Sequence, residues 1–312
     1  MVGLGGAPRG EIALSVIIPT YNHHQHLALT LGSLWAQDLD PARFEVIVVD
    51  DGSTDRTPEV CERFADRMSL SYFFQEDHGF RAAAARNVGL AAARGRTVVF
   101  LDTGVILAQN ALSRHSRRFM RSGAASIRLS YGVDEYSSVR NQQVTALLQR
   151  SAEEAAARDA APRGEREREA ATWRAAFEAL RGANGLLDCR HRRLRDLSHD
   201  LRGALAPWSI FWTSHVACRR DDALAIGGFD EALTSWGGED VDFGYRLAAG
   251  GVALVAETEY DSIHLPHRKN PASRRRSSLR NLQYLEKKHN DPLFADLGRH
   301  GWSALLAPAL AA

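Results

Sequence analysis

The chain has few cysteines, a nearly balanced charge and no long apolar segment. Its three cysteines, Cys61, Cys189 and Cys218, show neither CxxC nor metal-ligand spacing, which argues against a disulfide framework and favours a reducing cytoplasm. A net charge of +1 gives no electrostatic case for nucleic acid or an anionic membrane. No apolar run approaches the roughly 20 residues that span a bilayer, and residues 1–10 lack the apolar core of a signal peptide. We therefore expect a cytoplasmic protein with no transmembrane segment and no nucleic-acid partner.

The 312 residues, 45% of them hydrophobic, suffice for one large α/β domain with a smaller appendage. Buried strands are predicted over 14–19, 44–49, 70–75 and 97–101, and helices over 24–37, 54–68 and 81–94. Either Ser53 or Thr54 is a plausible N-cap for the second helix. This alternation predicts a mostly parallel sheet flanked by helices.

Polar side chains follow three of these strands directly. They are Thr20-Tyr21-Asn22, Asp50-Asp51 and Asp102. Ligands of such sheets bind beyond the carboxyl ends of the strands, so we expect the three clusters to meet in one crevice. A core strand needs no Asp at its end, which favours a functional interpretation.

The middle of the chain differs in composition. Residues 145–203 are rich in Ala, Arg and Glu, with alternating charge over 163–169 and apolar positions typical of amphipathic helices at Leu147, Leu148, Trp173, Phe177 and Leu180. A helical insertion that covers the sheet is the favoured interpretation, and a lid over the acceptor the alternative. The aromatic segment 208–212 fits core, interface or acceptor site, with core the preferred assignment.

A carboxylate-rich loop lies near the end of the chain. In Trp236-Gly-Gly-Glu-Asp-Val-Asp-Phe-Gly-Tyr-Arg246 adjacent carboxylates stand beside an indole. One carboxylate can act as a general base while the indole stacks on a sugar ring. The competing interpretation is a helix N-terminus whose acidic residues complement the macrodipole. A helix over 239–249, a strand over 252–257 and a loop over 263–267 follow.

The chain resembles the inverting glycosyltransferases of family 2, which share the nucleotide-sugar-binding GT-A fold. Four ordered motifs carry the resemblance: Ser15-Val-Ile-Ile-Pro-Thr-Tyr-Asn22, Glu45-Val-Ile-Val-Val-Asp-Asp-Gly-Ser53, Arg81 through Gly89, and Val99-Phe-Leu-Asp102. Gly227–Glu231 and Trp236–Arg246 resemble the C-terminal module of galactosyl-transferring enzymes. The implied organisation is a nucleotide-sugar half over 11–125, a helical insertion or acceptor region over 126–206, an acceptor and catalytic half over 207–268, and a basic helical segment over 269–312.

The resemblance implies a UDP-sugar site. Asp51 would accept the N3–H of uracil, and Arg81 would offset diphosphate charge. The other nucleotide-sugar residues would be Pro19, Thr20, Tyr21, Asn87, Asp102 and Thr103.

A divalent cation, Mg²⁺ or Mn²⁺, is also implied. Asp102 begins the family's Asp-X-Asp motif, but Gly104 replaces the second carboxylate. The ion would then use Asp102, the diphosphate and His264, with His267 as the rival ligand.

The implied catalytic base is Asp240, with Glu239 holding substrate hydroxyls and Trp236 and Gly238 at the acceptor. Asp242 is expected to be a helix N-terminal residue. The metal ion, Arg81 or the basic segment near Arg268 and Lys269 would stabilise the leaving diphosphate, and a solvated basic loop is an equally weighted interpretation of that segment.

These features predict transfer of glucose or galactose from a UDP-hexose to a hydroxyl of a small soluble acceptor, such as an aminocyclitol. The alternatives are a polysaccharide or oligosaccharide glycosyltransferase, a nucleotidyltransferase, and a non-catalytic or metal-independent nucleotide-sugar-binding protein. The sequence leaves the oligomeric state open. Thr20-Tyr21-Asn22 stands where a nucleotidyltransferase carries a Gly-rich basic loop, and retention of Glu239 and Asp240 argues against a non-catalytic role.

Overall fold

The computed structural model describes residues 11–119, 123–132, 170–179, 188–197, 201–265 and 271–306. The predictions for Leu147, Leu148, Leu180, the charge run 163–169, His267, Arg268 and Lys269 lie outside these ranges. Within them, no helix combines the length and apolar character needed to cross a membrane.

The N-terminal half alternates strands with helices, as predicted. The elements are β1 (Leu14–Thr20), α1 (His24–Trp35), η1 (Pro41–Arg43), β2 (Phe44–Asp50), α2 (Thr57–Ala65), β3 (Leu70–Phe74), α3 (Ala82–Ala92) and β4 (Thr97–Leu101). Strand β1 pairs in parallel with β2 and β4, and β2 pairs in parallel with β3. The carboxyl ends of these strands therefore share one edge of the sheet.

The C-terminal half extends the same sheet. Its strands are β5 (Val105–Leu107), β6 (Ala125–Gly132), β7 (His215–Arg219) and β8 (Leu254–His264), and the order is β3-β2-β1-β4-β7-β6-β8-β5. The β4–β7, β6–β7 and β5–β8 pairs are antiparallel and β6–β8 is parallel, so four of the seven pairings are parallel. The predicted mostly parallel α/β sheet is confirmed.

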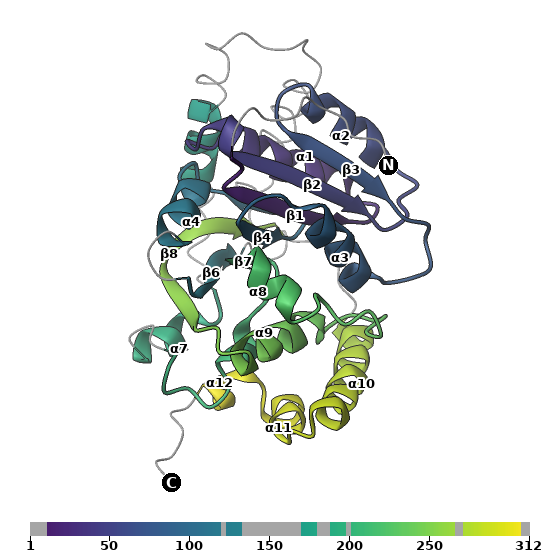
Figure 1. Cartoon of the computed structure of the whole chain (residues 1–312), viewed down its shortest axis with the longest axis vertical. Coiled ribbons are helices and arrows are strands. Elements are labelled where there is room, and N and C mark those ends of the chain that lie inside the picture. The colour runs from purple at the N-terminus through teal and green to yellow at the C-terminus, as the bar shows by residue number, and fades with distance from the viewer. Residues whose placement is uncertain are drawn as a thin grey trace.

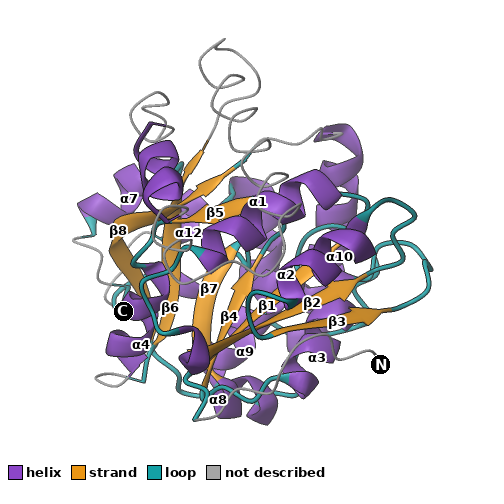
Figure 2. Ribbon diagram, turned by 90° about the horizontal axis from the view of Figure 1, so that it is seen from above, coloured by secondary structure: helices purple, strands orange, loops and turns teal. Residues whose placement is uncertain are grey.

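Helices cover both faces of this sheet (Figure 2). Along β1, Val16 and Ile18 belong to the cluster formed with α1, α2 and residues 170–179, whereas Ile17 belongs to the cluster on the side of α3, α8 and α9. This alternation follows from the two-residue period of a strand. Each fully buried aliphatic side chain stabilises the fold by roughly 1.5–3 kcal/mol.

The remaining helices lie mostly in the C-terminal half. They are α4 (Ala111–Phe119), α7 (His191–Asp196), η2 (Pro207–Ile210), α8 (Arg220–Ala225), α9 (Glu239–Ala249), α10 (Pro271–His289), α11 (Leu293–His300) and α12 (Trp302–Leu305). Figure 1 shows α10 and α11 beside α9, at the end of the molecule away from α1 and α2.

Two local predictions differ from the structure. Helix α2 begins at Thr57, because Asp55 accepts the Thr57 N–H at 3.0 Å, while the predicted cap Ser53 accepts the Asn22 N–H instead. Strand β8 continues to His264, past the predicted end at 257, because its second half pairs with β5. Ile263 and His264 therefore lie in a strand and not in a loop.

A buried carboxylate ties α9 to α10. Asp242 is fully buried and accepts hydrogen bonds from Arg246 at 2.6 and 2.8 Å, Lys288 at 2.8 Å and His289 at 2.7 Å. Burial alone would raise the pKa of Asp242, but these partners outweigh it and hold the pKa below its usual value. Asp242 thus helps to fix the position of α10, beyond the helix N-terminal role that was predicted.

We expect Asp242→Asn to lower the free energy of unfolding by roughly 3 kcal/mol, because it removes the buried carboxylate that neutralises Arg246 and Lys288. Urea unfolding at pH 7 measures this change. The control is Asp221→Asn on α8, whose carboxylate is 94% exposed. The native pKa of Asp242 is depressed, so its contribution is present above the unfolded pKa, about 4, and is lost as pH falls below it. A loss equal to that of the control would contradict the assignment.

Candidate functional site

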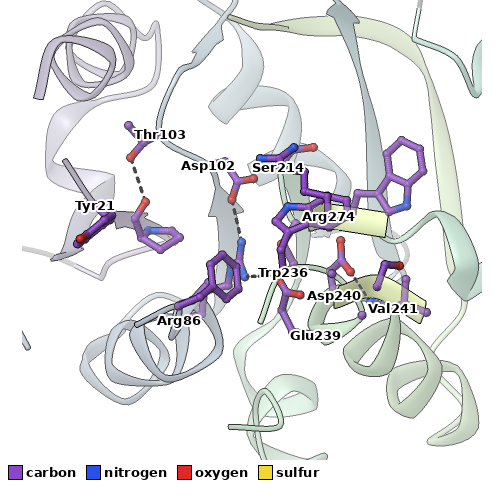
Figure 3. A pocket seen from close by; sticks show the side chains of 18 of the residues that line it. Tyr21, Arg86, Asp102, Thr103, Ser214, Trp236, Glu239, Asp240, Val241 and Arg274 are labelled. Atoms are coloured by element: carbon purple, nitrogen blue, oxygen red, sulfur yellow. Dashed lines mark hydrogen bonds and ion pairs between the residues drawn. The ribbon is translucent and has the colours of Figure 1, made fainter. Parts of the chain in front are cut away.

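One large cavity, about 880 Å³ in volume, opens at the carboxyl ends of β1, β2 and β4 and reaches the N-terminus of α9 (Figure 3). Its lining contains nearly all the residues singled out in the sequence: Pro19, Thr20, Tyr21, Asp51, Asp102, Thr103, Trp236, Gly238, Glu239, Asp240 and His264. The crevice expected from the strand ends therefore exists in the structure.

The β1–β4 side of the cavity is held by short hydrogen bonds. Thr103 Oγ1 donates to the Pro19 carbonyl at 3.0 Å, and the Tyr21 hydroxyl donates to Asp77 at 2.8 Å. Asp51 is buried, with one oxygen accepting from the Gln75 amide at 2.5 Å and the other from the Arg81 backbone N–H at 2.8 Å. The Asp51 carboxylate is therefore fixed in orientation at the cavity wall.

Two sequence-predicted residues lie outside the lining. The Arg81 guanidinium stands 3.5 Å from Asp51 and bonds the Glu76 carbonyl, so it supports Asp51 from behind. Asn87 holds the turn after α8, accepting the Phe229 N–H at 2.7 Å and donating to the Phe229 carbonyl at 2.9 Å. In this structure Asn87 positions a loop and does not face the cavity.

Arg86 lines the cavity but had no role in the predictions from the sequence. The Arg86 side chain is only 4% exposed. Its guanidinium binds Asp102 at 2.9 Å and Glu239 at 3.2 Å, and it lies over the Phe229 ring. Helical periodicity gives the signal that could have found it. Ala82 and Arg86, four residues apart on α3, share the face that lines the cavity, whereas Asn87 is turned away.

The Trp236–Asp240 segment turns sharply before α9 begins. Gly237 and Gly238 adopt φ values of 89° and 103°, which other residues rarely reach, and Glu239 and Asp240 then occupy the first turn of α9. Both acidic residues therefore complement the helix dipole and also face the cavity. The predicted helix N-terminus is therefore present, and the same two carboxylates are placed where the general-base hypothesis needs them.

Glu239 and Asp240 differ in environment. Glu239 is buried, with Oε1 bound to Arg86 and Oε2 without a hydrogen-bond partner among the described residues. Burial and the adjacent Glu239 carboxylate raise the pKa of Asp240 to about 7, against the lowering effects of Arg86 and the Val241 N–H. A carboxyl group that titrates near neutral pH and faces a cavity is suited to general-base chemistry.

Pairing within the sheet brings Asp102 and His264 to the same cavity. Val105 pairs with His264 in the β5–β8 ladder, and the Leu265 N–H bonds the Gly104 carbonyl at 2.9 Å. Gly104 has φ 91°, so a side chain at this position would strain the backbone. The turn that follows Asp102 is therefore built for glycine and not for a second carboxylate.

Asp102 and His264 could hold a metal ion only together with ligands from outside the protein. Among the described residues no group of three or more His, Cys, Asp or Glu could hold a metal. Arg86 occupies Oδ1 of Asp102, but the Asp102 side chain is 35% exposed, and both it and His264 line the cavity. An ion here would need further oxygen ligands from a substrate and water, which Mg²⁺ and Mn²⁺ accept.

The opposite wall is aromatic and comes from three segments. Trp212, Trp236 and Trp302 line it, and Trp212 contacts Trp302 edge-to-face with ring centroids 6.0 Å apart. Asn281 of α10 orients the Trp236 loop by donating to the carbonyls of Ser235 at 3.0 Å and Gly237 at 2.6 Å. Trp208 is buried in the core as preferred, whereas Trp212 reaches the cavity.

Comparison with known proteins gives two family matches. Residues 15–179 match the family described as "Glycosyl transferase family 2", and residues 200–268 match "N-terminal domain of galactosyltransferase". The chain is 35% identical over 290 residues to the validoxylamine A glucosyltransferase of Streptomyces hygroscopicus subsp. limoneus, covering 91% of this chain and 58% of that enzyme. It thus spans about three fifths of this relative's length.

Two solved structures share the fold. Staphylococcus aureus TarS 1–349 in complex with UDP-GlcNAc matches with a TM-score of 0.60 and 17% identity, over 93% of this chain and 72% of that one. The mannosyltransferase PcManGT of Pyrobaculum calidifontis, solved with GDP-Man and Mn²⁺, matches with a TM-score of 0.59 and 21% identity, over 96% and 71%. The fold is of the GT-A type.

We expect Asp240→Asn to stabilise the protein at pH 8, raising Tm by roughly 4 °C, because it removes a poorly solvated charge beside Glu239. The raised native pKa of Asp240 makes its protonation stabilising. Wild-type stability therefore declines relative to the variant as pH rises from about 4 through 7. Calorimetric melts at pH 5 and pH 8 measure the difference. A Tm difference that is the same at both pH values would show that Asp240 is ordinarily solvated.

Proposed function

Because this chain belongs to glycosyl transferase family 2, we propose that it transfers a hexose from a UDP-hexose to a hydroxyl of a small acceptor, with inversion at C1. The observation that carries the proposal is the placement of Asp240 across one cavity from Asp51 and Asp102. This arrangement offers a base at one end and nucleotide contacts at the other. The cavity volume of about 880 Å³ suits a nucleotide sugar.

The donor would lie along the ends of β1, β2 and β4. Asp51, with its orientation fixed by Gln75 and the Arg81 N–H, would accept the N3–H of uracil. Tyr21, 45% exposed, would present its ring to the base. Pro19, Thr20, Asp102 and Thr103 would complete the contacts to base and ribose, while Arg81 and Asn87 would act indirectly through Asp51 and the 227–231 turn.

Transfer would be a single in-line displacement. The acceptor oxygen forms a bond to C1 as the bond from C1 to the diphosphate oxygen breaks, and the electron pair of that bond leaves with UDP. Asp240 takes the acceptor proton, and its raised pKa gives the carboxylate the proton affinity for this step. Glu239 Oε2, buried and without a partner among the described residues, would accept a hydrogen bond from a sugar hydroxyl.

A divalent cation, Mg²⁺ or Mn²⁺, would be held by Asp102 and His264 together with the diphosphate. When bound, such an ion supplies positive charge to the leaving group. Arg86 holds the Asp102 carboxylate in place.

The acceptor would stack on the aromatic wall. Trp236 is 40% exposed and stands beside Gly237 and Gly238, directly before the base. An indole face packs against the apolar face of a pyranose or cyclitol ring. The similarity to an enzyme named for glucosylating validoxylamine A supports an aminocyclitol acceptor.

The first test is UDP release and product formation from UDP-glucose and UDP-galactose with polyol and aminocyclitol acceptors, with Mg²⁺, with Mn²⁺ and with chelator. We expect metal-dependent transfer that falls by roughly 10²–10⁴-fold in Asp240→Asn. Turnover that is unchanged by chelator would remove the metal assignment. Binding of UDP-sugar without turnover across the panel would favour a non-catalytic nucleotide-sugar-binding protein.

The pH dependence of kcat/KM provides a second test. Asp240 acts in its ionised form, so we expect activity to rise with pH and to be half-maximal near pH 7, where its pKa lies. In Asp240→Glu the midpoint should shift, because the carboxylate moves relative to Glu239. A profile that is flat between pH 5 and pH 8 would argue that Asp240 is not the base.

A further inference from the structure

The charges around the cavity are unbalanced. The described lining residues include five carboxylates, Asp51, Asp77, Asp102, Glu239 and Asp240, against two guanidinium groups, Arg86 and Arg274. Arg86 already binds Asp102 and Glu239. A diphosphate that enters this cavity brings more negative charge, so its stabilisation requires further positive charge.

Arg274 is placed to supply that charge. It lies in the first turns of α10, and its guanidinium is 4.6 Å from the centre of the Trp236 ring. Arg274 and Ser278, four residues apart, both line the cavity, as expected for one face of a helix. Figure 3 shows the Arg274 side chain projecting into the cavity with Asp102, Ser214 and Asp240 around it.

The electrostatic environment of Arg274 couples it to the donor side. Burial lowers the pKa of Arg274, and the Asp102 carboxylate opposes this by raising it. An arginine keeps its charge under such conditions, because a guanidinium group loses its proton only far above physiological pH. A cation that has lost part of its hydration and lies near Asp102 is ready to bind a second anion in a bidentate way.

The rest of α10 fixes the Arg274 backbone. Asn281 bonds the loop on both sides of Trp236, and Lys288 and His289 bind Asp242. Helix α10 is therefore joined to α9, which carries Asp240. The Asn281 bonds hold the loop before α9 and the Lys288 and His289 bonds hold α9 itself, so α10 is tied at two places to the segment that carries Asp240.

We propose that Arg274 binds the diphosphate of the UDP donor and stays with it as the leaving group. This inference rests on the proposed function and adds a binding residue to it. Because the same guanidinium stacks on Trp236, Arg274 stands at the junction of the donor and the proposed acceptor platform.

The test is calorimetric titration of uridine, UMP and UDP into the wild type, Arg274→Ala and Arg274→Lys, each with chelator and with Mg²⁺. We expect Arg274→Ala to weaken UDP binding by about 10- to 100-fold, the usual effect of losing a charged hydrogen bond. Uridine affinity should stay unchanged, and Arg274→Lys should recover part of the UDP affinity. The effect should persist with chelator, because Arg274 contacts the phosphates directly.

The matched control is Arg275→Ala. Arg275 is the next residue on α10 and lines only a smaller neighbouring pocket of about 320 Å³. Its loss should leave UDP affinity within about twofold of the wild type. Thermal melts of each variant verify folding, and Arg274→Lys keeps the test open if Arg274→Ala unfolds.

The outcomes distinguish a failure of the Arg274 inference from a failure of the proposed function. Wild-type binding of uridine together with equal UDP affinity in Arg274→Ala would overturn the inference and leave Arg274 as a packing partner of Trp236. An equal loss of uridine and UDP affinity in Arg274→Ala would also overturn it, because the phosphates would then play no part. Failure of the wild type to bind both uridine and UDP would overturn the proposed function itself.

Discussion

The site depends on one buried cation. Arg86 of α3 binds Asp102 after β4 and Glu239 at the start of α9, and so joins the two halves of the chain at the base of the cavity. A guanidinium that is 4% exposed has lost most of its hydration, and only close carboxylates compensate for that loss. Removing either carboxylate would leave buried charge unmatched. The positions of Asp102 and Glu239 are therefore set together.

Asp240 and Asp242, two residues apart on α9, have opposite electrostatic environments. Asp242 is surrounded by Arg246, Lys288 and His289, which hold its pKa down and stabilise the ion. Asp240 faces the cavity beside another carboxylate, which holds its pKa up and stabilises the proton. One helix turn thus contains a structural anchor, Asp242, and the residue that we propose as the base, Asp240.

Local patterns were sufficient to predict the nucleotide half of the fold. The apolar runs of β1, β2 and β4 end in polar residues, and parallel strands bring such ends to one edge, so Asp51, Asp102 and Tyr21 were located without tertiary information. Helix α9 was predicted from its acidic first turn. The role of Arg86 was missed because its partners Asp102 and Glu239 lie 16 and 153 residues away in the sequence. Long-range pairing also explains the error over His264, since the second half of β8 lies between β6 and β5 and pairs with both.

The contribution of α10 could not be read from the sequence, because the segment is basic throughout and its residues look alike. Arg274, Arg275 and Arg276 are three consecutive arginines that the sequence alone does not distinguish. The rotation of α10 about its axis and its packing against the rest of the protein decide which of them lines the cavity. That rotation is fixed by Asn281 and Lys288, whose partners belong to the Trp236 loop and to α9. The same contacts that orient Trp236 therefore select Arg274 over its neighbours. Asp102, Asp240 and Arg274 line the same cavity, so α10 brings a cation to a space that the sheet and α9 line with carboxylates.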